Sequence, residues 1–289
     1  MPLFIRKLTP DVIVDDLGHS VPWGSEVFSK TPGTVFFRHL HRRSLPGQVY
    51  FPTRIALTTI ENFYPYIYKS WPFVCESDSS LNDLVNLGIG QERITKILPG
   101  VDSNKFRPQE KTRNPSIVYF GGLRDYKRPW EIIYSFKELK QKINDLSLTI
   151  VGSGPALNKT KKIAANTGLL EHITFAGYVS DEMLSEIVSK SWVNIHTSKT
   201  EGFGYSILEA SSAGTPTVAY NVPGVQDVIE NGVNGYLVPD TDRRKLATII
   251  SEIINSYNDR WIIDSRRTGL KYSWEVAASG WEKYLCNLS

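Results

Sequence analysis

The sequence predicts an α/β protein of two domains, each built on a doubly wound parallel sheet, of which the first is incomplete. In the second half of the chain, short strand patterns alternate with helical stretches, and this order produces a parallel sheet with helices on both faces. The first half offers only about four such strands. Between the halves, residues 99–115 combine prolines with charged residues and have the composition of a linker.

Composition narrows the classes of protein to consider. A chain of 289 residues with 41% hydrophobic and 22% charged residues is typical of a globular protein long enough for two domains. A net charge of +3 is too small to indicate a nucleic-acid partner. No apolar run reaches the roughly 18 residues of a membrane span, and no signal-peptide core is evident, so a cytoplasmic location is expected. Cys75 and Cys286 have no metal-ligand spacing around them, and neither a disulfide nor zinc is expected.

The first half reads as a βαβ-like arrangement. Its strands are predicted at 11–16, 34–38, 73–76 and 95–98. Apolar side chains at mixed helical spacing fill residues 50–71 until Pro72 interrupts them, and a further helix is predicted from about Ser79 to Gly88. The aromatic stretch 63–73 has two interpretations, a packed helix or a surface that faces a membrane.

The second half has a strand pattern about every 20 to 40 residues. Strands are predicted at 116–121, 147–152, 173–179, 192–197, 216–222 and 235–238. Helices that carry tryptophans follow from about residue 242 to residue 287. Ligands of a doubly wound sheet bind beyond the carboxyl ends of its strands, so the loops after the strands should carry the chemistry.

The loop after strand 192–197 places two carboxylates around a glycine-flanked aromatic residue. Its residues include Glu201, Gly202, Phe203, Gly204, Tyr205, Ser206 and Glu209. Ser206 is expected to N-cap a helix. Glycines just before a helix let backbone N–H groups approach a phosphate at the positive end of the helix dipole. The pattern indicates a site for an anion that also bears hydroxyl groups.

Glu209 has a structural alternative. Ser206 and Glu209 have the spacing of a capping box, in which the carboxylate accepts a hydrogen bond from the N-cap amide and needs no ligand. Glu201 has no such role, because a carboxylate beside an anion site raises the electrostatic cost without helping the fold. Glu201 therefore indicates a ligand that becomes cationic or offers hydroxyls.

Two further glycine loops follow strands of the same sheet. Gly121 and Gly122 precede a cluster of cations at a helix start, which is typical of a diphosphate clamp, although solvated surface charge is the alternative. Gly152 and Gly154 invite a dinucleotide interpretation, but residue 157 is Leu where a third glycine would stand. The pattern therefore gives little support to NAD.

The second half resembles a known family. Glu201 and Glu209 reproduce the E-x7-E motif of the retaining family 4 glycosyltransferases, and the segment 214–239 (GTPTVAYNVPGVQDVIENGVNGYLVP) is similar to their usual continuation. The resemblance covers about residues 10–285 and implies the GT-B fold, which has two Rossmann-like domains. It implies that Glu201 lies against the transferred sugar and that Glu209 holds the ribose hydroxyls.

The resemblance also implies the donor-binding residues. Lys127 would neutralise the leaving diphosphate, and Arg124 would substitute for an arginine whose usual position is occupied here by Gly122. The implied donor-binding residues are Gly121, Gly122, Arg124, Lys127, Gly152, Gly154, Tyr178, Val179, Gly202, Phe203, Gly204, Tyr205, Ser206 and Glu209. The family is metal-independent, so neither a metal nor a cofactor other than the donor is expected.

The basic segment 38–43 resembles the histidine-bearing loop of the same family. The resemblance implies that His39 and His41 face the donor sugar as catalytic residues, and a basic surface cluster is the competing interpretation. A metal would need further ligands than this histidine pair. The remaining histidines, His19, His172 and His196, are interpreted as structural.

Domain limits and function follow from the resemblance. We expect a partial acceptor-side domain at 1–98, a linker at 99–115, a nucleotide-sugar-binding domain at 116–270 and a C-terminal helix at 271–289 that packs back on the first domain. The first domain lacks roughly two or three βα units. The predicted function is a retaining hexosyltransferase that moves a sugar from a nucleoside diphosphate sugar to a hydroxyl of a glycan, a glycolipid or a small metabolite.

The short first half leaves an alternative function open. The chain would then be a nucleotide-sugar-binding module, or a truncated transferase that is inactive or needs a partner chain to supply the missing acceptor half. Peripheral contact with the inner face of a membrane is a further expectation.

Overall fold

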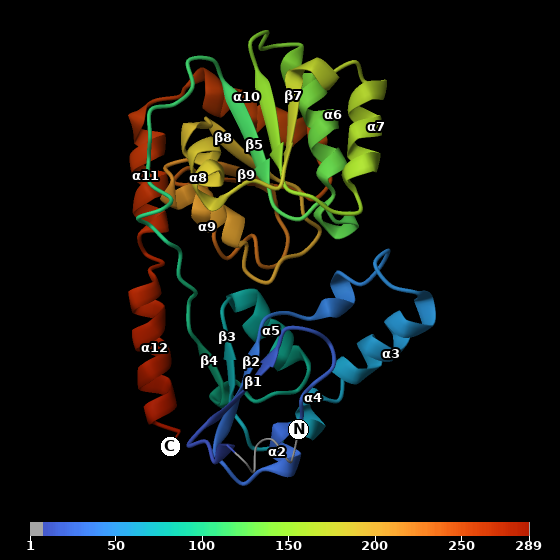
Figure 1. Cartoon of the computed structure of the whole chain (residues 1–289), viewed down its shortest axis with the longest axis vertical. Helices are drawn as coiled ribbons and strands as arrows, with labels where there is room; N and C mark the ends of the chain where they lie inside the picture. The colour runs from blue at the N-terminus through green and yellow to red at the C-terminus, as the bar shows by residue number, and fades with distance from the viewer. Residues whose placement is uncertain (1–7, 289) are drawn as a thin grey trace. The chain divides into compact units, whose positions relative to one another are not determined.

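The computed structural model describes residues 8–288 and divides into two compact units (Figure 1). The first unit comprises the residues up to Gly100 together with those from Trp274 onward, and the second comprises Val101–Ser273. Each unit is built on its own parallel sheet, so the predicted α/β class with two sheets, the first one smaller, is confirmed.

The first unit has four strands in the order β1-β2-β3-β4. Its strands are β1 (Ile13–Leu17), β2 (Gly33–Phe37), β3 (Phe73–Cys75) and β4 (Ile94–Lys96). Its helices are α2 (Ser25–Phe28), α3 (Phe51–Glu61), α4 (Tyr64–Ile67), α5 (Asp78–Asn86) and α12 (Trp274–Cys286), with 3-10 turns η1 (His41–Arg43) and η2 (Gln91–Arg93). Val35, Phe37 and Phe73 are fully buried at the centre of its core.

The aromatic stretch 63–73 is divided between the core and the surface. Tyr64 and Tyr68 are fully buried, and the Tyr68 hydroxyl donates a hydrogen bond of 2.9 Å to a carboxylate oxygen of Asp15. Phe63 and Tyr66 are exposed. The packed-helix interpretation therefore describes the buried tyrosines, which lie four residues apart on one helical face.

Helix α5 begins one residue before the predicted start. The Ser77 hydroxyl accepts a hydrogen bond from the Ser80 amide at 3.0 Å, so Ser77 is the N-cap and Asp78 is the first helical residue. The helix ends at Asn86, and Gly88 follows with a left-handed φ of 94°.

The second unit has six parallel strands in the order β10-β9-β8-β5-β6-β7. Its strands are β5 (Ser116–Phe120), β6 (Ser147–Val151), β7 (Ile173–Gly177), β8 (Val193–His196), β9 (Thr217–Tyr220) and β10 (Gly235–Val238). Its helices are α6 (Pro129–Lys140), α7 (Leu157–Asn166), α8 (Asp181–Lys190), α9 (Tyr205–Ser212), α10 (Arg243–Asn255) and α11 (Asp259–Gly269), with 3-10 turns η3 (Asp125–Lys127) and η4 (Leu170–His172).

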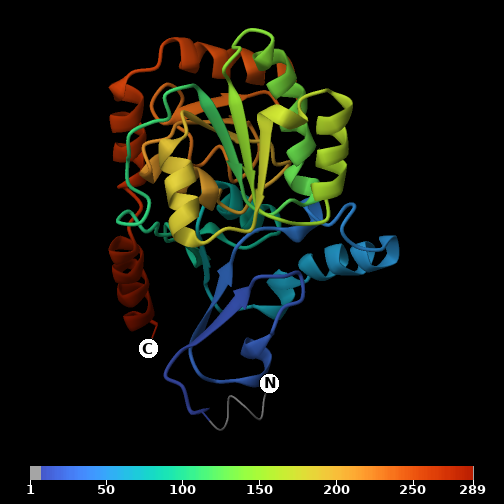
Figure 2. The same ribbon diagram turned by 45° about the horizontal axis from the view of Figure 1, so that its top comes forward.

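Helices cover both faces of this sheet, as Figures 1 and 2 show. Helix α6 packs against α7 and α10 on one face, whereas α9 packs against α11 on the other face, where α8 also lies. Strands β5, β8 and β9 are buried at every residue, which is expected for strands of a parallel sheet covered on both sides. Strand β5 pairs with both β6 and β8, so the chain runs outward from β5 in two directions.

The predicted linker at 99–115 is mostly part of the second unit, which begins at Val101. Val101 and Phe106 are buried in the core of that unit, and the Val101 amide donates to the Tyr272 carbonyl at 3.1 Å. The Lys111 ammonium donates to the carbonyls of Ser189 and Ser191 at 2.9 and 2.8 Å. Two buried apolar side chains and one half-buried lysine hold the segment in place, although its proline content is typical of a linker.

Helix α12 belongs to the first unit although it ends the chain. The Trp281 ring packs edge-on against Phe36 of β2 with centroids 5.2 Å apart. The Tyr284 hydroxyl lies 2.8 Å from the Thr34 hydroxyl, also on β2. The described C-terminal helix therefore covers part of the sheet that the N-terminal half forms.

The contact between α9 and α11 leads to a testable prediction. A Cβ atom at Gly269 would lie 2.5 Å from backbone atoms of Ser212, which cannot move without displacing α9. We expect Gly269→Ala to lower the free energy of unfolding by about 1–3 kcal/mol, as overpacked cores do. Urea unfolding measures the change, and Gly122→Ala is the matched control, because a Cβ at Gly122 meets no atom closer than 3.8 Å. Equal stability of both variants would contradict this account of the contact.

Candidate active site

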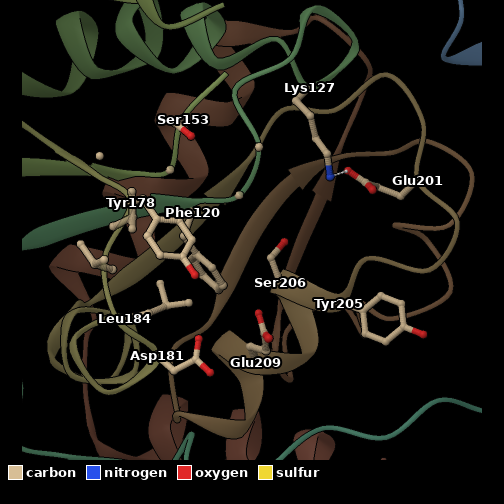
Figure 3. A pocket seen from close by; sticks show the side chains of 16 residues that line it. Phe120, Lys127, Ser153, Tyr178, Asp181, Leu184, Glu201, Tyr205, Ser206 and Glu209 are labelled. Carbon is tan, nitrogen blue, oxygen red and sulfur yellow. Dashed lines mark hydrogen bonds and ion pairs between the residues drawn. The ribbon is translucent and has the colours of Figure 1, made fainter. Parts of the chain in front are cut away.

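A cavity of about 450 Å³ opens at the carboxyl ends of the strands in the second unit (Figure 3). The loops after β5, β6, β7 and β8 and the first turns of α8 and α9 form its walls. The lining residues are Phe120, Gly121, Gly122, Lys127, Val151, Gly152, Ser153, Gly177, Tyr178, Val179, Asp181, Leu184, Glu201, Tyr205, Ser206 and Glu209. Strand order reverses between β5 and β8, which is where doubly wound sheets bind their ligands.

Glycines allow the loops after β5 and β6 to touch. A Cβ atom at Gly152 would lie 2.0 Å from the Gly121 carbonyl oxygen, and one at Gly154 would lie 2.4 Å from the Leu123 carbonyl oxygen. Both glycines have positive φ values, 124° and 151°, which other residues rarely adopt. Of the glycines predicted to bind the donor, Gly121, Gly122 and Gly152 line the cavity, whereas Gly154 does not line it and allows the close contact with Leu123.

Three side chains hold the Glu201 carboxylate. The Lys127 ammonium and the Ser198 hydroxyl each donate to Oε1 of Glu201 at 2.6 Å, and Nε2 of His196 lies 3.3 Å from the same oxygen. Figure 3 shows the ion pair between Lys127 and Glu201 on the cavity wall. The structure thus brings together the two predicted residues of opposite charge.

Arg128 ties the loop after β5 to the loop after β8. Its guanidinium donates to the carbonyls of Thr197 and Ser198 at 2.9 Å each and pairs with Asp240. Arg128 adopts a left-handed φ of 49°, which is uncommon outside glycine. The neighbouring residue Lys127 is thereby held beside the loop that carries Glu201.

Mutual attraction keeps both members of the ion pair charged. Burial opposes the ionisation of Glu201, but Lys127 and the hydrogen bond from His196 outweigh it and hold the pKa of the carboxyl well below its usual range. Burial also opposes the charge of Lys127, yet the Glu201 carboxylate raises the pKa of the ammonium. A ligand that enters this cavity therefore meets an ionised carboxylate and a charged ammonium side by side.

Glu209 is a carboxylate of a different kind. It lies on α9 at the cavity, and among residues 8–288 its side chain makes no hydrogen bond. Burial, followed by the repulsion from Asp181, raises the pKa of Glu209 to about 7. The capping-box interpretation is wrong, because Gly204 is the N-cap and Ser206 lies inside the first turn without a capping hydrogen bond. A half-buried carboxylate that makes no hydrogen bond suits a ligand that donates hydrogen bonds.

Other predicted donor contacts lie away from the cavity wall. Phe203 is buried in the core, where its ring packs edge-on against Tyr272 at 5.8 Å. Gly204 supplies the left-handed N-cap of α9 with φ 90°, and Gly202 precedes it outside the lining. Arg124 is exposed and does not line the cavity. Its positive charge repels that of Lys127 and so acts to lower the pKa of the Lys127 ammonium.

His39 and His41 belong to the first unit, at the end of β2 and in η1. Their ring centroids lie 4.4 Å apart. The His41 amide donates to Glu61 at 2.7 Å, and burial lowers the pKa of the His41 imidazole. Their catalytic role stays a prediction.

Some site residues carried weak signals in the sequence. The sequence gives a structural interpretation of His196, whereas in the structure its Nε2 lies 3.3 Å from the Glu201 carboxylate. Asp181 and Leu184 line the cavity from α8, the helix that follows β7. Their position after the carboxyl end of a strand is the sequence feature that could have identified them, because doubly wound sheets bind ligands there.

The described part of the chain contains neither a metal-binding cluster nor a membrane-spanning helix. Within residues 8–288, no three His, Cys, Asp or Glu side chains are grouped to hold a metal ion. Within the same residues, no helix has the length and apolar character needed to cross a membrane.

Comparisons with known proteins match this chain to sugar transferases. A family model described as "Glycosyl transferases group 1" matches residues 101–267. The GDP-mannose-dependent alpha-(1-6)-phosphatidylinositol monomannoside mannosyltransferase of Mycobacterium tuberculosis is 27% identical over 174 residues, which are 54% of this chain and 45% of the relative. The poly(glycerol-phosphate) alpha-glucosyltransferase of Bacillus subtilis is 32% identical over 148 residues, 51% of this chain and 21% of the relative. This chain spans about half the length, or less, of these curated relatives.

Solved structures share the fold. Sucrose-phosphate synthase from Thermosynechococcus elongatus matches with a TM-score of 0.83 and 19% identity over 98% of this chain and 75% of that one. Anabaena Alr3699/HepE in complex with UDP and glucose matches with a TM-score of 0.74 and 19% identity over 89% of this chain and 72% of that one. These likenesses confirm the predicted GT-B fold.

The raised pKa of Glu209 predicts a pH effect on stability. Between about pH 4.5 and about pH 7, folded Glu209 keeps a proton that the unfolded chain has lost, so the free energy of unfolding should fall as the pH rises through this window. Glu209→Gln should remove that part of the fall. Urea unfolding at several pH values checks this, with Glu186→Gln on the exposed side of α8 as the control. Identical pH dependence in Glu209→Gln and the unmodified chain would contradict the shift.

Proposed function

Because this chain belongs to the glycosyl transferases group 1 family, we propose that it transfers a hexose from a nucleoside diphosphate sugar to an acceptor hydroxyl, with retention of configuration at the anomeric carbon. The observation that carries the proposal is one cavity that holds a paired Lys127 and Glu201 together with a half-buried Glu209, whose side chain makes no hydrogen bond within residues 8–288. A diphosphate sugar has a complementary group for each of these side chains.

The diphosphate is proposed to lie between the glycine loop after β5 and the start of α9. Gly121 and Gly122 leave the backbone open to close approach, and Lys127 supplies a positive charge. The N-terminal amides of α9, at Tyr205 and Ser206, point a partial positive charge in the same direction. These groups would stabilise the negative charge that grows on the departing diphosphate, and the proposal includes no metal.

The nucleoside is proposed to fill the other end of the cavity. Glu209 would accept hydrogen bonds from the ribose hydroxyls, which would lower its pKa again on binding. Tyr178 and Val179, at the end of β7, would contact the base. Among the solved structures that share the fold, Alr3699/HepE is described in complex with UDP and glucose, which supports a nucleotide-sugar ligand of this general kind.

Glu201 is proposed to face the transferred sugar. The ionised Glu201 carboxylate stabilises positive charge, and the anomeric carbon becomes cationic as the bond to the diphosphate breaks. The nucleoside diphosphate leaves with the bonding electron pair of the old glycosidic bond. The oxygen of the acceptor hydroxyl forms the new bond at that carbon, and its proton passes to the departing diphosphate. His39 and His41, peripheral membrane contact, a cytoplasmic location and a partner chain for the acceptor stay predictions.

We expect Glu201→Gln to lower the transfer rate by about 10²-fold or more, because the amide keeps the shape of the side chain but loses its charge. Binding of UDP, GDP or ADP, scored by thermal shift, should survive. Glu186→Gln makes the same chemical change on an exposed helix and should leave transfer unaltered. If Glu201→Gln transferred the sugar at the rate of the unmodified chain, the proposed role of Glu201 in stabilising the cationic sugar would be contradicted.

Lys127→Met tests the diphosphate contact. Loss of a hydrogen bond between charged groups should weaken binding of the nucleoside diphosphate by about 10- to 100-fold and leave binding of the free nucleoside unchanged. Lys190→Met, which removes an exposed lysine of α8, is the control. Equal losses for nucleoside and diphosphate would point to misfolding instead.

The same assays separate the transferase from the binding-module alternative. A chain that binds a nucleotide-sugar but neither transfers nor hydrolyses the sugar with any acceptor tested would be a binding module. Release of nucleoside diphosphate from the donor by the unmodified chain, abolished in Glu201→Gln, would support the transferase.

A further inference from the structure

The two oxygens of the Glu201 carboxylate have different surroundings. Lys127, Ser198 and His196 all approach Oε1, at 2.6, 2.6 and 3.3 Å. Within residues 8–288, no hydrogen bond reaches Oε2. Glu201 lines the cavity, so Oε2 is the oxygen that remains available to a ligand.

The three donors to Oε1 are not equivalent. Lys127 lines the cavity and is the donor that a diphosphate would attract. Ser198 and His196 are fully buried, at 0% and 3% exposure, and neither lines the cavity. A ligand in the cavity would therefore compete for Lys127 alone, while Ser198 and His196 remain on Glu201.

The protonation of His196 follows from its contacts. A carboxylate only accepts hydrogen bonds, so Nε2 of His196 must carry a proton. Nδ1 of His196 is buried without a partner, and a proton there would be an unsatisfied buried donor. A proton on Nε2 therefore serves the contact with Glu201, whereas one on Nδ1 would have no acceptor. An imidazole whose second nitrogen has no partner is costly to bury, and a residue chosen for packing alone would avoid that cost.

We propose that His196 is a positioning residue, which with Ser198 holds Oε1 of Glu201 so that Oε2 faces the transferred sugar after the donor diphosphate has drawn Lys127 away. This inference rests on the proposed function. His196 touches no substrate in this account and acts only through Glu201. Without His196, the Glu201 carboxylate would no longer be held in one orientation when Lys127 moves away, although the donor would still bind.

The competing account is that His196 fills space in the core. Asn194 offers a matched comparison, because it lies two residues earlier on the same face of β8, is buried at 1% exposure and donates one side-chain hydrogen bond of 3.0 Å, to Thr217. Loss of the hydrogen bond of either Asn194 or His196 should lower the free energy of unfolding. Only the loss at His196 should change catalysis.

The test compares His196→Leu, His196→Gln and Asn194→Leu. Gln places an N–H donor close to where Nε2 of the histidine lies, whereas Leu fills the space without a donor. We expect His196→Leu to lower kcat by about 10- to 100-fold with unchanged Kd for UDP, GDP or ADP, and His196→Gln to restore most of the rate. Asn194→Leu should lower Tm while kcat stays close to that of the unmodified chain.

Nitrogen NMR of the imidazole distinguishes the two accounts, because the chemical shift of Nε2 would not depend on Glu201 if His196 only filled space. Nε2 of His196 should carry the proton, and its shift should change in Glu201→Gln but not in Glu186→Gln. A protonated Nδ1, or a rate for His196→Leu equal to that of the unmodified chain, would overturn the positioning role and leave the proposed function intact. A chain that binds none of the three nucleotides and transfers no sugar would overturn both.

Discussion

The Glu201 carboxylate lies where water solvates it poorly, and the fold must supply the hydrogen bonds that water would otherwise give. Lys127 reaches it from the turn after β5, and His196 and Ser198 reach it from the end of β8. These strands are neighbours in the sheet, with Ile117 opposite Val193, so their carboxyl ends meet at one edge. An unpaired buried charge is far more costly than an exposed one. The register of β5 against β8 is thus a condition for the site, and the hydrogen bonds of Arg128 to the loop after β8 strengthen it.

Part of this site could be predicted from the sequence because the rule that governs it is local. Lys127 and Glu201 are 74 residues apart, yet each follows a strand of the same parallel sheet by a few residues. Once the strands are recognised from their apolar runs, both side chains are expected at the same edge. The unpartnered position of Glu209 is different, because the sequence offered a capping box as an equally good explanation. Only the left-handed Gly204, which starts α9 two residues before Ser206, removes that alternative.

Side-chain direction within a loop could not be predicted in the same way. Phe203 turns into the core because Tyr272, which precedes the last helix, offers its ring an edge-on contact. Gly154 is required by the Leu123 carbonyl of another loop, and residues 101–115 are held by partners more than 70 residues away. In each case the residue that determines the side-chain position is remote in sequence, so the local composition does not predict that position. His196 belongs to the same class, since a histidine in a buried strand gives no local sign of the carboxylate that it contacts.

Helix α12 makes the first unit discontinuous, because β1 to β4 come from the start of the chain and the helix that covers β2 comes from its end. During synthesis on the ribosome, the Phe36 side of β2 lacks this cover until α12 has emerged, after the whole of the second unit. The second unit is continuous and has all of its own residues earlier. The first unit, whose strands are translated before the second unit, can therefore complete its fold only after the second unit has been translated.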